Sequence, residues 1–154
     1  MNHFSFDDSR IHWQALPEIA HLQYSILDID PRHRIIDVLF KFAAGRRIVL
    51  HRHNVLNKTF VVQGEHRLYE ADGTLMEARP AGRYTSSEAT EKPHREGGGG
   101  QDAIVLFSIR GGDGVLYEIL DDDMQRIGEL HWQDFVDLYQ AQLQAGKEDA
   151  CGNG

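Results

Sequence analysis

Short runs that alternate apolar and polar residues fill the middle of the chain, and they constrain its fold more than any other feature. In residues 34–42, every second side chain from Ile36 to Phe42 is apolar, whereas Asp37 and Lys41 lie between them. This period of two is typical of a half-buried strand. Further runs follow to residue 127, with turn signals about every 8 to 12 residues, a pattern typical of a β-sandwich or barrel. The sequence therefore predicts an all-β domain.

Local signals refine this expectation. The Asp72-Gly73 pair between two apolar runs predicts a β-hairpin, and the runs at 103–109 and 114–120 predict a second one. Residues 85–102 are polar and rich in glycine, which predicts a long loop, and the four glycines at 97–100 predict flexibility there.

The C-terminal part follows a different period. Apolar residues at three-and-four spacing predict an amphipathic helix over 131–145. We expect one domain over 1–154, because this length suits a single core. Its parts are a leading segment with short edge strands (1–33), a barrel (34–127), the helix, and a flexible tail (146–154).

Charge and hydropathy exclude several classes of partner. Sixteen Lys and Arg against 24 Asp and Glu give a formal net charge of −8, which repels nucleic acid and anionic lipid. No apolar run approaches the ~18 residues of a transmembrane helix. The N-terminal residues lack the basic start and apolar stretch of a secretory signal, so we expect a cytoplasmic protein.

Two histidines one residue apart stand between glycines in residues 45–64. On a strand, residues two apart point to the same face, so His51 and His53 would direct both imidazoles to one point. Imidazole is a ligand for iron, zinc, copper and nickel. The alternative is a metal-free pair satisfied by hydrogen bonds. The only cysteine is Cys151 in the polar tail, so histidine and carboxylate would have to hold any metal.

The spacing of these residues resembles the cupin superfamily. Gly45, His51, His53 and Gly64 fit its first motif, and Pro80-Ala81-Gly82 fits the turn of its second. The resemblance extends from about residue 13 to the helix. It is greatest for small three-histidine cupins of the acetylacetone-cleaving and dihydroxyacetophenone dioxygenase type. It implies an RmlC-like jelly-roll β-barrel with a C-terminal α-helix.

Two positions depart from the common cupin pattern. Asn57 and Lys58 occupy the places of the usual glutamate ligand, and Thr85 occupies that of the third histidine. The resemblance to three-histidine dioxygenases implies that His94 replaces the latter, giving His51, His53 and His94 as metal ligands. Whether a carboxylate joins them stays open. Three carboxylates could do so, although their sequence context favours solvated charges: Glu65, Glu88 and Glu91.

The same resemblance implies a function. We expect one divalent metal, Fe(II) before Zn, Ni or Mn, and O2-dependent cleavage of a C–C bond in a small β-diketone or hydroxyketone. The alternatives are a metal- or ligand-sensing cupin without turnover and a zinc-dependent isomerase or hydrolase. Arg83 and Tyr84, after the second motif, and His66, directed inward by strand parity, are candidate substrate contacts. Small cupins commonly pair through edge strands, which implies a homodimer.

Overall fold

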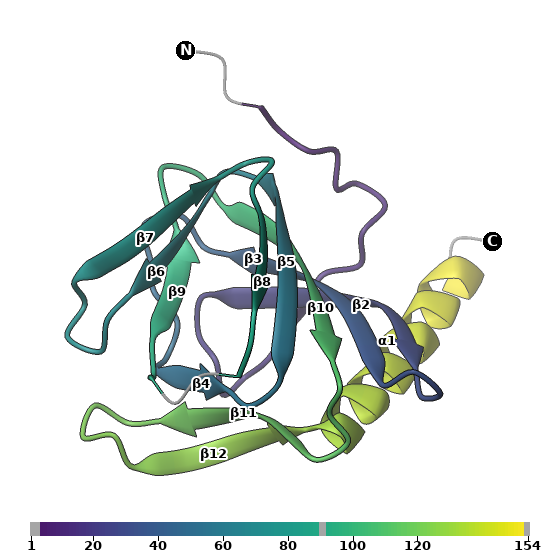
Figure 1. Cartoon of the computed structure of the whole chain (residues 1–154). Helices are drawn as coiled ribbons and strands as arrows, with labels where there is room; N and C mark the ends of the chain where they lie inside the picture. Colours follow the sequence, from purple (N-terminus) through teal and green to yellow (C-terminus); the bar gives the residue numbers. More distant parts are fainter. Residues whose placement is uncertain (1–3, 90–91, 153–154) are drawn as a thin grey trace.

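A computed structural model describes residues 4–89 and 92–152, with the side chains of 149–152 left out. Within these residues, strands dominate and one helix closes the chain (Figure 1). The elements in order are β1 (Gln14–Ala15), β2 (Leu22–Asp30), β3 (Ile35–Phe42), β4 (His51–His53), β5 (Leu56–Gln63), β6 (Glu65–Tyr69), β7 (Leu75–Pro80), β8 (Tyr84–Ser87), β9 (Arg95–Gly98), β10 (Ala103–Arg110), β11 (Val115–Leu120), β12 (Arg126–His131) and α1 (Trp132–Gly152).

The strands form three sheets that enclose one interior. A six-stranded sheet has the order β1-β2-β3-β10-β5-β8, and two three-stranded sheets have the orders β12-β11-β4 and β7-β6-β9. An antiparallel bridge between His51 and His94 connects the two smaller sheets. The sheets do not close into one continuous ring, and the arrangement is that of a jelly roll, as the resemblance to cupins implies (Figure 1).

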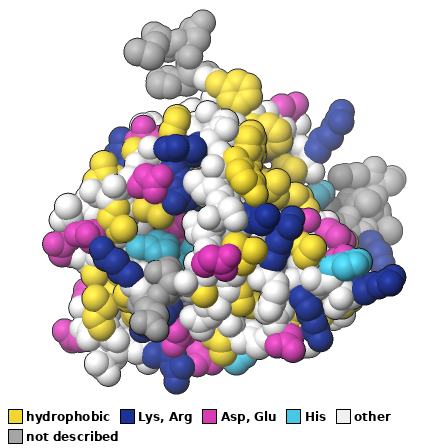
Figure 2. Space-filling view, viewed as in Figure 1, with side chains coloured by type: hydrophobic (Ala, Val, Ile, Leu, Met, Phe, Trp, Pro, Cys, Tyr) yellow, Lys and Arg dark blue, Asp and Glu magenta, His cyan; other side chains and the backbone are white. Residues whose placement is uncertain are grey.

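The core lies on the inner face of the large sheet, where the alternating pattern places it. Ile36, Val38 and Phe42 of β3 are at most 2% exposed, and Val105 and Phe107 of the paired strand β10 are equally buried. Burying an aliphatic or aromatic side chain of this size stabilises the fold by roughly 1.5–3 kcal/mol. Acidic and basic side chains are interspersed on the face shown in Figure 2.

Helix α1 covers one end of the large sheet. The Asp134 carboxylate accepts a hydrogen bond from the backbone N–H of His131 at 2.7 Å, which caps the first turn. The Gln142 amide forms two 2.8 Å bonds with the backbone of Ile26 in β2, accepting from its N–H and donating to its C=O. No helix among the described residues is both long and apolar enough to cross a membrane.

Several boundaries differ from the sequence-based expectation. The helix was expected over 131–145 but runs from Trp132 to Gly152, into the predicted tail. Strand β2 is a nine-residue strand between β1 and β3, whereas only short edge strands were expected before residue 34. Its length follows from pairing with β3, a contact that lies outside the local pattern.

The predicted hairpin at 103–120 is wrong. Both strands exist, but β10 pairs with β3 and β5, while β11 pairs with β4 and β12. Gly111 turns the chain with a φ of 87°, a conformation that glycine adopts without steric cost, and the chain passes from one sheet to another. The hairpin at Asp72-Gly73 is confirmed, since β6 and β7 pair antiparallel around it.

Candidate metal centre

Two short segments supply four side chains that meet inside the jelly roll. His51 and His53 lie on β4 with Arg52 between them, and the burial of this strand alternates accordingly. His94 directly precedes β9 and Glu96 lies within it, again two residues apart. Because residues two apart on a strand share a face, each segment contributes two side chains to the same side.

Backbone hydrogen bonds hold these segments together. The N–H groups of His51 and His94 donate to each other's carbonyl oxygens at 3.0 and 2.9 Å, and the N–H of Ile48 donates to the carbonyl of Glu96 at 2.8 Å. The prediction of a long loop over 85–102 is therefore wrong in part, because tertiary pairing makes strands of 84–87 and 95–98.

The glycines after Glu96 serve close packing. Gly97 and Gly98 are buried in β9, and a Cβ atom on Gly97 would collide with the backbone carbonyl of Arg46. Side chains at these positions would push β9 away from the residues that lead into β4. The flexibility predicted for the glycines at 97–100 therefore does not apply to Gly97 and Gly98, which are buried in a strand.

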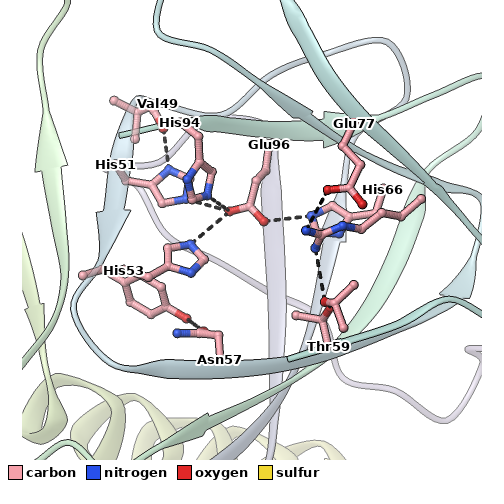
Figure 3. A network of polar contacts seen from close by, with 12 residues as sticks. Val49, His51, His53, Asn57, Thr59, His66, Glu77, His94 and Glu96 are labelled. Carbon is pink, nitrogen blue, oxygen red and sulfur yellow. Dashed lines mark hydrogen bonds and ion pairs between the residues drawn. The ribbon is translucent and has the colours of Figure 1, made fainter. Parts of the chain in front are cut away.

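The four side chains form a compact, buried group. Their candidate ligand atoms all lie within 4.8 Å of one another. Oε2 of Glu96 is 2.6 Å from Nε2 of His51 and 3.5 Å from Nε2 of both His53 and His94 (Figure 3). All four residues are at most 8% exposed.

The buried carboxylate and the imidazoles shift each other's ionisation. Burial favours the neutral form of Glu96, but the hydrogen-bonding histidines around it outweigh this and hold its pKa well below the usual value. Burial lowers the pKa of His53 from 6.5 to about 4, against the opposing attraction of Glu96. His53 is therefore a neutral imidazole with a free electron pair at neutral pH, the form that binds metals.

Buried nitrogen atoms that lack a hydrogen bond indicate whether a metal ion would fit among these side chains. Nε2 of His53 and Nε2 of His94 are buried and form no hydrogen bond within the described residues. Nδ1 of His51 donates to the carbonyl of Val49 at 2.8 Å, so its Nε2 is the nitrogen that faces the group. Buried polar atoms without partners are rare unless an ion or water satisfies them. Three imidazole nitrogens and one carboxylate oxygen suit iron, zinc or nickel.

The carboxylate of this group is not one of those singled out from the sequence. Glu65 points to Arg67, and Glu88 is exposed. Glu91 lies outside the described residues. Glu96 was missed because it lies in a polar, glycine-rich run, although its spacing from His94 repeats that of His51 and His53. Asn57, at the usual glutamate position, instead accepts a hydrogen bond from the buried Tyr117 hydroxyl at 2.6 Å.

The predicted substrate contacts lie in different places. Arg83 is exposed and Tyr84 is 56% exposed, and neither lines the pocket that opens onto the four-residue group. His66 points inward as expected and is fully buried. It lies on the other side of Glu96 from the three histidines (Figure 3).

A pocket leads from the surface to the group. His53, His94 and Glu96 form its inner end. Its walls combine apolar, uncharged polar and charged side chains, which are Asn57, Thr59, Leu68, Met76, Glu77, Arg79, Ser87, Glu88, Lys92 and Phe107.

The fold of this chain resembles that of solved structures, although its sequence matches no known family. No protein-family profile matches the sequence, and no curated protein matches it. Several solved structures do match the fold of this chain. An RmlC-like cupin protein from Ralstonia eutropha is 22% identical with a TM-score of 0.71, covering 94% of this chain and 89% of its own.

Two further structures have named activities. An acetylacetone dioxygenase from Acinetobacter johnsonii is 15% identical with a TM-score of 0.67, covering 92% of this chain and 93% of its own. The polyketide cyclase RemF from Streptomyces resistomycificus is 16% identical with a TM-score of 0.56 and covers 84% of each chain. At these identities the likeness concerns the fold, and the chain is a cupin in fold: an RmlC-like jelly roll with a C-terminal helix.

Proposed function

We propose that this protein is a metal-dependent cupin dioxygenase that cleaves a C–C bond of a small β-diketone or hydroxyketone with O2. The observation that carries the proposal is the buried group of three histidines and Glu96 at the inner end of an accessible pocket. The structural likeness to an acetylacetone dioxygenase supports the reaction class.

The chain's own residues have distinct tasks in this proposal. His51, His53, His94 and Glu96 would hold the ion, and Fe(II) would supply open positions for substrate and O2. Glu96 lowers the net positive charge of the site, compared with the three neutral histidines expected from the sequence.

The pocket wall also contains an ion pair between an arginine and a glutamate. Arg79 is 8% exposed, and its guanidinium donates to the Glu77 carboxylate at 3.1 Å and to the Thr85 hydroxyl at 3.3 Å. Its Nε is buried without a hydrogen bond in the described part of the chain. Glu77 balances the charge of Arg79, so this residue would offer a substrate oxygen an N–H donor rather than an excess positive charge.

A second candidate is a zinc enzyme that polarises a carbonyl without redox chemistry. The added carboxylate is compatible with it, because a ligand set of imidazole and carboxylate suits zinc as well as iron. The fold likeness to a polyketide cyclase supports it.

Metal content and oxygen uptake distinguish these candidates. We expect one ion per chain in protein purified without chelator, and loss of most of it in His94→Ala and in Glu96→Ala. The control is His12→Ala, since His12 is exposed. With Fe(II) loaded, we expect oxygen consumption with simple β-diketones.

Three other outcomes of these measurements would contradict the dioxygenase proposal. Bound metal without oxygen uptake on any diketone would favour the zinc candidate. Metal that binds with no turnover of any carbonyl compound would indicate a sensing protein. Absence of binding for Fe(II), Zn(II), Ni(II) and Mn(II) would refute the metal centre.

A further inference from the structure

The two oxygens of the Glu96 carboxylate have different partners. Oε2 faces His51, His53 and His94. Oε1 lies 2.8 Å from Nε2 of His66, which is on β6 and 0% exposed. His66 pairs with Gly98 and Glu96 pairs with Leu68, so the two residues are diagonal neighbours on adjacent strands.

The surroundings of His66 leave only one of its ring nitrogens with a hydrogen-bond partner. Its ring stacks on Phe42 with centroids 5.1 Å apart and packs edge-on against Phe107 at 5.9 Å. Its Nδ1 is buried and has no hydrogen-bond partner among the described residues. Nε2 is the ring nitrogen that faces a carboxylate oxygen, which accepts hydrogen bonds, so Nε2 donates to Oε1.

We propose that His66 is a positioning residue that occupies Oε1 of Glu96 and directs Oε2 alone toward a metal ion held by the three histidines. The inference rests on the metal centre proposed above. It assigns a role to a histidine that is not itself a ligand, and it requires that Glu96 bind the ion through one oxygen.

Two physical arguments favour this role over simple filling of the core. A buried carboxylate needs a hydrogen bond to each oxygen, and without His66 the oxygen Oε1 would have none that the structure records. Hydrogen bonds that orient a ligating carboxylate also typically contribute 10–100-fold to metal affinity. An apolar side chain would fill the space against Phe42 and Phe107 equally well.

The test compares two substitutions that retain bulk. His66→Phe keeps a ring beside Phe42 but removes the donor, whereas His66→Gln keeps an N–H group. The dissociation constant for Zn(II) is measured by competition with a chromophoric chelator. We expect weakening of about 10–100-fold in His66→Phe and of only a few-fold in His66→Gln. The visible spectrum of the Co(II) form should change in His66→Phe and little in His66→Gln.

A double-mutant cycle separates positioning from a general structural effect. In a Glu96→Ala background His66 has no carboxylate to hold, so His66→Phe should leave the Zn(II) affinity unchanged. Equal weakening in both backgrounds would overturn the inference, as would wild-type affinity in the single His66→Phe variant. Wild-type protein that binds no Zn(II), Fe(II), Ni(II) or Mn(II) would overturn the proposed metal centre as well. Thermal unfolding of each metal-free variant reports whether it is folded.

Discussion

At the scale of single residues, the decisive feature is an ionised carboxylate buried among histidines. Removing a carboxylate from water costs several kcal/mol unless partners compensate. Glu96 is 3% exposed and has His51 and His66 as close partners, one at each oxygen. The histidines that would bind a metal thus also stabilise the carboxylate in its absence. Removing one of them affects both affinity and stability.

The ionisation of His53 predicts an acid-sensitive metal-free protein. Its pKa is about 4 in the folded state, whereas the ordinary value for a histidine exposed to water is 6.5. The unfolded chain therefore binds the extra proton first as pH falls, and stability present above pH 6.5 is lost progressively toward about pH 4. The loss is on the order of 3 kcal/mol. Glu96 acts in the same direction at lower pH, since its pKa in the folded state lies well below the ordinary value of 4.5.

Denaturant unfolding in the presence of chelator measures this effect. The free energy of unfolding at pH 7 and at pH 5 should differ less in His53→Phe than in the wild type. Identical pH dependence in the two proteins would show that His53 is not held in its neutral form.

At the scale of elements, β9 shows why close packing requires particular glycines. Arg47 pairs with Gly97, and Ala44 forms a parallel bridge to Gly98. These contacts bring the residues before β4 against β9. The position of Glu96 relative to His51 therefore depends on the absence of two side chains.

A pair of glycine substitutions tests this packing. Gly97→Ala would drive a methyl group into the Arg46 carbonyl. We expect the free energy of unfolding to fall by about 1–3 kcal/mol and metal binding to weaken. Gly100→Ala is the matched control, because a Cβ atom there meets nothing within 4 Å. Its free energy of unfolding should change little. Equal effects of the two substitutions would contradict the packing argument.

Features that depend on local interactions could be predicted from the sequence, whereas those that depend on tertiary pairing could not. The alternation in β3, the Asp72-Gly73 hairpin and the shared face of His51 and His53 are local, and all three appear in the structure. Strand β9 was not predicted, because a polar, glycine-rich run favours a loop until tertiary pairing imposes strand structure. Glu96 was missed for the same reason.

At the scale of the whole molecule, a metal ion would bind only the assembled jelly roll. Its ligands lie on β4 and on the segment at β9, which belong to different three-stranded sheets. A ligand that binds only the folded state stabilises it by about 2.7 kcal/mol at a free concentration of 100 Kd. Bound metal would therefore stabilise the contact between these two sheets.

Calorimetry with and without chelator tests this coupling. For a chain of this size we expect saturating metal to raise the Tm by roughly 5–10 °C. The shift should be much smaller in Glu96→Ala. An unchanged Tm in the wild type would show that the ion does not bind the folded state with useful affinity.

The order of the ligands along the chain has a kinetic consequence. His51 and Glu96 are 45 residues apart, so an ion held by both closes a loop of that length, as a disulfide would, but reversibly. Closure of such a loop is entropically costly during folding, and each local pair alone offers the ion only two ligands. The complete chelate therefore forms late, and the ion should slow unfolding far more than it accelerates folding.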